Sequence, residues 1–175
     1  MRSLLELFGL GTPADAPAGD TATVRRIVDA LEALDGDQAR FLASFAYLLS
    51  RVANADFDIT DDETQAMEAI VRDKGGLPEA QAVLAVEIAK GQARLFGGTE
   101  DFQVAREFKR ITERSQRIDL LDCLFAVAAA DGVVTSDEEE QIRRVADELG
   151  LTHRELADVR SNYNEYRAVL KRLDR

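Results

Sequence analysis

Acidic residues gather in two segments of the chain, and their side chains are of the type that binds hard metal ions. The first segment contains Asp56, Asp58 and Glu63, and the second contains Asp131 and Glu138. Carboxylate oxygens are preferred by Ca²⁺ and Mg²⁺, whereas softer metals prefer thiolate or imidazole ligands. These five residues are therefore candidate ligands of a divalent cation, with Ca²⁺ or Mg²⁺ as the expected ion.

The same residues have a second explanation that needs no ligand. Thr60 and Thr135 are each followed three residues later by a glutamate, Glu63 or Glu138, which is the pattern of a capping box at a helix N-terminus. Asp131 would lie at the unfavourable C-terminal end of a helix dipole, so an Asx-turn or a cation should compensate its charge. The sequence alone leaves helix capping and metal binding both open.

Neither acidic segment has the pattern of an EF-hand. In the first, Asp61 stands where that loop requires glycine, and Met67 stands at the position of the bidentate glutamate. In the second, Val133 takes the place of the next ligand. Calcium prefers about six to eight oxygens, so tight binding would need water, the other loop or a partner in addition to either loop.

The composition of the chain excludes several functional classes. Its 175 residues include 33 acidic and 22 basic side chains, a net charge of −11 that repels phosphate backbones, so nucleic acid is not an expected partner. Cys123 and His153 are the single residues of their types, which excludes an internal disulfide or a Cys/His zinc site within one chain. With no secretion signal and no apolar run long enough for a membrane span, we expect a cytoplasmic protein.

The apolar residues that would position the acidic segments follow a helical period. From residue 20 onward they recur at intervals of three and four, and no alternating run indicates a strand. The first helix should end at Asp35-Gly36 and the second near Val52, and further helices are expected over 60–74, 78–95, 100–113, 115–130, 135–149 and 152–173. We predict an all-α protein whose single domain, residues 20–175, has about seven to nine helices. Residues 1–19 would form an amphipathic stub and a Pro/Gly/Ala linker.

An internal repeat connects the two acidic segments. Eight of the residues from 49 to 63, together with Gly75, are identical to their counterparts from 124 to 138, together with Gly150, at one constant offset. Each copy consists of a helix, an acidic loop and a second helix, over about 41–75 and 116–150. Gly132 is expected to supply a left-handed residue after the first helix of its copy.

These segments resemble a known family. Val127 to Glu138, with the apolar residues that follow, is similar to the second half of a TerB-type tellurite-resistance domain, and Leu49 to Glu63 resembles the first half. The likeness covers roughly residues 40–160. It implies an all-helical domain with duplicated acidic loops, proposed to bind metal ions in bacterial responses to tellurite, oxyanions and other stresses.

Carried over to this chain, the resemblance pairs Asp56 with Glu63 and Asp131 with Glu138. The chain departs from the family pattern at Phe57, where the family usually has glycine. A left-handed turn is unfavourable for phenylalanine, so Asp58 is expected to replace or join Asp56 in the first site.

The sequence favours a non-catalytic role. It contains no P-loop, no G-x-S-x-G and no dinucleotide-binding glycine pattern. Cys123 lies in an apolar run and should be buried, and His153 should be exposed at a helix start. We therefore expect an accessory or sensor module of a tellurite, oxyanion or general stress response, with protein partners such as membrane-associated stress proteins.

The alternative is a protein–protein interaction scaffold whose acidic loops are only helix caps. Arg106, Lys109 and Arg110 form a local basic cluster, opposite in sign to the acidic loops. Either these residues pair with acidic neighbours in the same fold, or they mark a docking face for a partner. The sequence does not define an oligomeric state.

Overall fold

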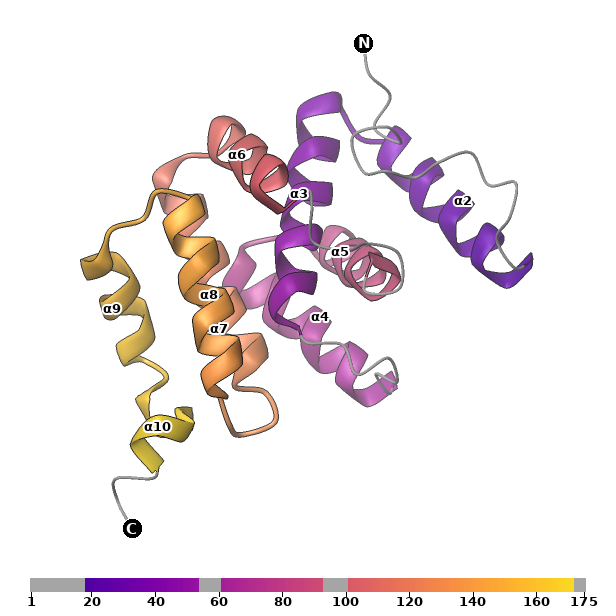
Figure 1. Ribbon diagram of the computed structural model, residues 1–175. Coiled ribbons are helices and arrows are strands. Elements are labelled where there is room, and N and C mark those ends of the chain that lie inside the picture. Colours follow the sequence, from indigo (N-terminus) through magenta and orange to yellow (C-terminus); the bar gives the residue numbers. More distant parts are fainter. Residues whose placement is uncertain (1–17, 54–60, 93–100, 172–175) are drawn as a thin grey trace. The chain divides into compact units, whose positions relative to one another are not determined.

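Helices make up most of the chain that the computed structural model describes, namely residues 18–53, 61–92 and 101–171 (Figure 1). In chain order they are α2 (Ala18–Glu32), α3 (Gly36–Val52), α4 (Asp61–Gly75), α5 (Glu79–Gln92), α6 (Asp101–Ile111), α7 (Arg114–Ala128), α8 (Ser136–Glu148), α9 (His153–Ser161), the 3-10 turn η1 (Asn164–Tyr166) and α10 (Ala168–Lys171). Within these residues, β geometry is confined to an isolated bridge between Val134 and Arg167. The all-α prediction is confirmed.

The chain divides into two compact units, residues 1–40 and 41–175. In the first unit, Asp35 begins α3, because its Oδ1 accepts hydrogen bonds from the backbone N–H groups of Asp37 at 3.1 Å and Gln38 at 3.0 Å. The predicted break before this helix is confirmed. Helix α2 begins at Ala18, inside the predicted linker, and residues 1–17 lie outside the described part of the chain.

The core of the second unit is formed by the apolar faces that the sequence period predicts. Most of the large side chains that are completely or almost completely buried come from α3, α7 and α8, and they include Phe45, Leu48, Leu49, Leu120, Leu121, Leu124, Ile142 and Val145. Burying one leucine or phenylalanine side chain contributes about 1.5–3 kcal/mol. These helices therefore form the rigid frame that holds the second acidic loop, between α7 and α8.

The two repeat units occur as the helix pairs α3–α4 and α7–α8. Helix α4 packs against α7, and Arg51 of α3 forms an ion pair with Glu148 of α8 at 2.6 Å. Each helix of the first repeat unit therefore contacts a helix of the second. Each pair ends in a left-handed glycine, Gly76 with φ 67° and Gly150 with φ 70°. The sequence match of Gly150 with Gly75 is thus displaced by one residue, because Gly75 is still part of α4.

Gly75 has a packing role instead. A Cβ atom at this position would lie 2.8 Å from Cζ of Phe45, which is closer than real Cβ contacts. Phe45 belongs to an aromatic cluster with Phe41 and with Phe108 of α6, with ring centroids 5.5 to 6.4 Å apart. The glycine allows the end of α4 to approach this cluster.

The prediction of one continuous helix over 152–173 is wrong. The helical path ends after Ser161 and the chain continues as η1 and α10. The Tyr163 hydroxyl donates a hydrogen bond to Asp122 Oδ1 at 2.7 Å, and the Tyr163 ring stacks on Phe125 with centroids 5.5 Å apart. These contacts hold Tyr163 against α7, and its side chain is part of the core. The chain therefore turns at this point and does not continue as a helix.

Candidate functional site

The second acidic loop joins α7 to α8. Gly132 has a φ of 90°, which is the left-handed residue expected there. The Asp131 side chain closes an Asx-turn, in which Oδ1 accepts a hydrogen bond from the backbone N–H of Val133 at 2.9 Å. This bond compensates an acidic residue that follows the C-terminus of α7. The local explanation for Asp131 is therefore realised in the structure.

Glu138 forms the capping box that the sequence predicts. Its backbone N–H donates to Thr135 Oγ1 at 3.2 Å, and its Oε2 accepts bonds from the Thr135 backbone N–H and hydroxyl, both at 2.8 Å. Thr135 is the N-cap of α8. The reciprocal bonds satisfy two N–H groups that the helix leaves without backbone partners.

The loop is also held by the C-terminal segment, which sequence reasoning missed. The Val134 N–H donates to the Tyr166 carbonyl at 2.8 Å, and the Ala168 N–H donates to the Val134 carbonyl at 3.0 Å. These two bonds form the parallel bridge between Val134 and Arg167, and the Val134 side chain is fully buried. No periodic pattern could reveal it, because the bridge is one residue long and joins distant parts of the chain.

The turn and the capping box use one oxygen of each carboxylate. Within the described ranges, Asp131 Oδ2 and Glu138 Oε1 have no hydrogen-bond or ion-pair partner. Carboxylate oxygens suit a hard cation, but two of them fall short of the roughly six to eight that calcium prefers. The described residues contain no group of three or more His, Cys, Asp or Glu side chains that could hold a metal ion.

The structure describes only the end of the first acidic segment, from Asp61 onward. Asp56 and Asp58 lie in the segment 54–60, outside the described residues, and so does Thr60, the expected capping partner of Glu63. Glu63 itself lies in the first turn of α4 and is exposed. A shared site of Asp56, Asp58 and Glu63 therefore stays a prediction.

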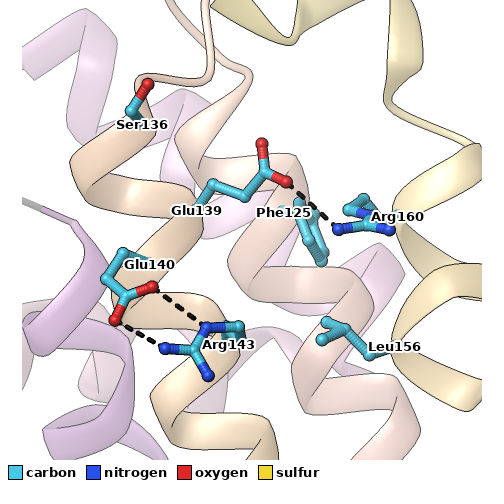
Figure 2. A pocket seen from close by; sticks show the side chains of 7 residues that line it. All are labelled: Phe125, Ser136, Glu139, Glu140, Arg143, Leu156 and Arg160. Carbon is cyan, nitrogen blue, oxygen red and sulfur yellow. Dashed lines mark hydrogen bonds and ion pairs between the residues drawn. The ribbon is translucent and has the colours of Figure 1, made fainter. Parts of the chain in front are cut away.

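A cavity of about 200 Å³ lies between α7, α8 and α9, and sequence analysis did not indicate it (Figure 2). Its apolar lining comes from α7 and α9, and its polar lining from α8 and α9; the residues are Phe125, Leu156, Ser136, Glu139, Glu140, Arg143 and Arg160. Figure 2 shows the side chains of Glu139 and Arg160 pointing toward each other across it. The cavity is adjacent in sequence to the second acidic loop, since Ser136 follows Thr135.

The predicted basic cluster is exposed on α6, and one of its members is paired. Arg110 forms an ion pair with Glu107 at 2.7 Å. Arg106 and Lys109 are exposed, and the Lys109 side chain lies over Gly150, where a Cβ atom would be 2.5 Å from Nζ. An ammonium group at this end of α8 interacts favourably with the helix dipole. Pairing within the fold is thus confirmed for Arg110.

The two other residues that could do chemistry have the predicted environments. Cys123 is completely buried, and burial, followed by the charge of Asp122, raises the pKa of its thiol to about 12. The thiolate needed for nucleophilic attack is therefore unfavourable near neutral pH. His153 is the first residue of α9 and is exposed.

The fold and the geometry of the second acidic loop define a class of protein: an all-helical domain in which two helix pairs, α3–α4 and α7–α8, contact each other. The family described as tellurite resistance protein TerB matches this chain over residues 41–161, and the chain belongs to that family. Searches of curated proteins and of solved structures found no match. In the described ranges, none of the helices has the length and apolar character needed to cross a membrane.

Proposed function

We propose that this TerB-family protein is a non-catalytic accessory or sensor module of a bacterial cytoplasmic stress response, and that its second acidic loop binds Ca²⁺ or Mg²⁺. Family membership supports the link to a tellurite or general stress response. The observation that carries the cation site is that Asp131 and Glu138 each keep one carboxylate oxygen without a partner in the described part of the chain. The buried, protonated Cys123 thiol supports a role without nucleophilic catalysis.

A cation at this loop would act on the joint between two helices. Asp131 follows α7, and Glu138 lies in the first turn of α8. Binding to both carboxylates would neutralise charge and stiffen the helix pair, which changes the surface offered to a protein partner. Since two carboxylate oxygens leave most coordination positions to water, we expect modest affinity.

A calorimetric titration of the chelator-treated full chain with CaCl₂ and MgCl₂ tests this proposal. Asp131→Asn and Glu138→Gln keep the oxygen that accepts the turn or cap hydrogen bond, but they remove the charge. Each should weaken binding by about tenfold or more. Asp158→Asn is the matched control, because Asp158 is an exposed residue of α9. Absent binding, or equal affinity in all variants, would contradict the cation site.

The second candidate function is an interaction scaffold with no ion. It is favoured by the finding that an Asx-turn and a capping box already account for Asp131 and Glu138. Its docking face would include the exposed Arg106 and Lys109 of α6. Under this alternative, Arg106→Glu with Lys109→Glu abolishes binding to an identified partner from the source cells, whereas Asp131→Asn leaves that binding unchanged.

A further inference from the structure

The C-terminal segment that contains Tyr163 and Arg167 is bound to the helical domain at three separate points. The Tyr163 ring stacks on Phe125 of α7, with centroids 5.5 Å apart. The backbone N–H and carbonyl groups of Val134 both form hydrogen bonds with the segment, at 2.8 and 3.0 Å. Arg167 donates two hydrogen bonds to the Glu139 carboxylate of α8, at 2.7 and 3.0 Å. Peptide-binding domains hold peptides in a similar way, through backbone pairing together with contacts to individual side chains.

This segment lies outside the part of the chain that matches the TerB family. The match ends at residue 161, whereas Phe125, Val134 and Glu139, which hold the segment, lie within it. We call these three residues the docking surface. The docking surface therefore belongs to the family domain, and the segment that covers it is an extension of that domain.

The two carboxylates that bind the segment each have another cationic partner on the domain. Glu139 also accepts a hydrogen bond from Arg160 of α9, at 3.3 Å. Asp122 accepts the Tyr163 hydroxyl on Oδ1 at 2.7 Å, and its Oδ2 forms an ion pair with Lys74 of α4 at 3.2 Å. Departure of the segment would therefore leave neither carboxylate without a cation, which avoids the large cost of a buried charge that has lost its partner.

The docking surface would favour a replacement once the segment has left. Phe125 and Val134 are completely buried while the segment is bound. Its departure would uncover the face of the Phe125 ring on which Tyr163 stacks, and it would break both backbone hydrogen bonds of Val134. A replacement must supply an aromatic ring, backbone hydrogen bonds and a cation for Glu139. The net charge of −11 favours the approach of a positively charged one.

We propose that the docking surface binds a segment of a partner protein, and that the chain's own C-terminal segment occupies it when the partner is absent. The partner segment would have an aromatic residue followed four residues later by an arginine, which is the spacing of Tyr163 and Arg167. Its aromatic ring stacks on Phe125, its backbone pairs with Val134 and its guanidinium group binds Glu139. This interface goes beyond the proposed function, since it needs neither a bound cation nor the basic residues of α6.

A fluorescently labelled peptide with the sequence of residues 161–171 tests the docking surface in competition with the chain's own segment. Wild-type full-length protein should bind the peptide weakly, because the tethered segment has a high effective concentration. Arg167→Gln in the protein weakens the tethered segment, so this variant should bind the peptide at least about tenfold more tightly. Arg154→Gln is the matched control, since Arg154 is 91% exposed on α9 and its replacement should leave the wild-type affinity unchanged. Fluorescence anisotropy measures the affinity, and thermal unfolding verifies that both variants are folded.

The arginine of the peptide provides a second test. A peptide with the Arg167→Gln change should bind the Arg167→Gln protein at least about tenfold more weakly than the original peptide does. The proposal is overturned if the Arg167→Gln protein binds the original peptide no more tightly than the wild-type protein does, or if the two peptides bind this variant alike.

Sedimentation of the wild-type protein distinguishes a partner protein from a second copy of this chain. A monomer at all concentrations supports the partner protein. A concentration-dependent dimer that the unlabelled peptide dissociates would show that two copies exchange their C-terminal segments, and it would overturn the proposal of a different partner.

Discussion

Glycine is required at Gly132 and at Gly75 for different physical reasons. At Gly132 the reason is the backbone angle, because φ is 90° and the space around a Cβ atom is open. At Gly75 the reason is space, because a Cβ atom would meet the Phe45 ring at 2.8 Å. The first glycine shapes the second acidic loop, and the second permits close packing of α4 on the aromatic cluster.

Replacing Gly75 with alanine should destabilise the protein. Phe45 is only 1% exposed and packs against Phe41 and Phe108, so its ring cannot move without disturbing the cluster. Overpacking of this kind costs about 1–3 kcal/mol. Urea unfolding of Gly75→Ala measures the loss. The control is Gly36→Ala, since nothing lies within 4 Å of a Cβ atom at Gly36, and similar stability of the two variants would contradict the packing role.

At the scale of elements, an ion pair fixes the start of α9 to the start of α7. Arg114 donates two hydrogen bonds to Glu155, both at 2.6 Å. Glu155 is also the capping-box partner of Thr152. The bonds from Arg114, followed by those from the Thr152 backbone and side chain, lower the pKa of Glu155 from 4.5 to about 2.

This shift gives the stability a specific dependence on pH. Because the folded-state pKa of Glu155 is lowered, its contribution is fully present above about 4.5 and is lost as the pH falls toward about 2. Carboxyl NMR titration of Glu155 should give the low value, and Arg114→Gln should raise it. An ordinary pKa for Glu155 in the wild-type chain would show that the pair does not persist in solution.

The helices were predictable where local signals determine them. The Thr135 and Glu138 capping box defines the start of α8, and apolar periodicity defines the buried faces of α3 and α7. The interruption of the helix at residues 162–167 was not predicted, because the hydrogen bonds that turn the chain there, from Tyr163 to Asp122 and from Ala168 to Val134, join distant parts of the chain. The cavity was not predicted either, because its lining residues come from three different helices, α7, α8 and α9.

At the scale of the whole described molecule, the two repeat units depend on each other. A helix pair cannot bury its apolar face alone, and here α4 of one pair packs on α7 of the other. The ion pair between Arg51 and Glu148 crosses the same boundary, with side chains 9% and 22% exposed. Because both side chains are largely buried, this ion pair should contribute more to folding stability than a surface ion pair does.

A double-mutant cycle with Arg51→Met and Glu148→Gln should reveal this coupling. Glu148→Gln removes the carboxylate that receives two bonds from Arg51, at 2.6 and 3.1 Å, and should cost about 1–3 kcal/mol. The double variant should lose less than the sum of the two single losses. Arg154 and Asp158, 3.9 Å apart and 91% and 73% exposed, form the control pair. Equal coupling in both cycles would contradict the special role of the first.

Two backbone hydrogen bonds at the bridge between Val134 and Arg167 bring the ends of the segment 134–167 together, so that this segment forms a closed loop. Every cavity residue except Phe125 belongs to that loop. Breaking the two bonds would expose the amide protons of Val134 and Ala168 together, so their deuterium exchange should be correlated. Those two protons would then report how often the walls of the cavity separate.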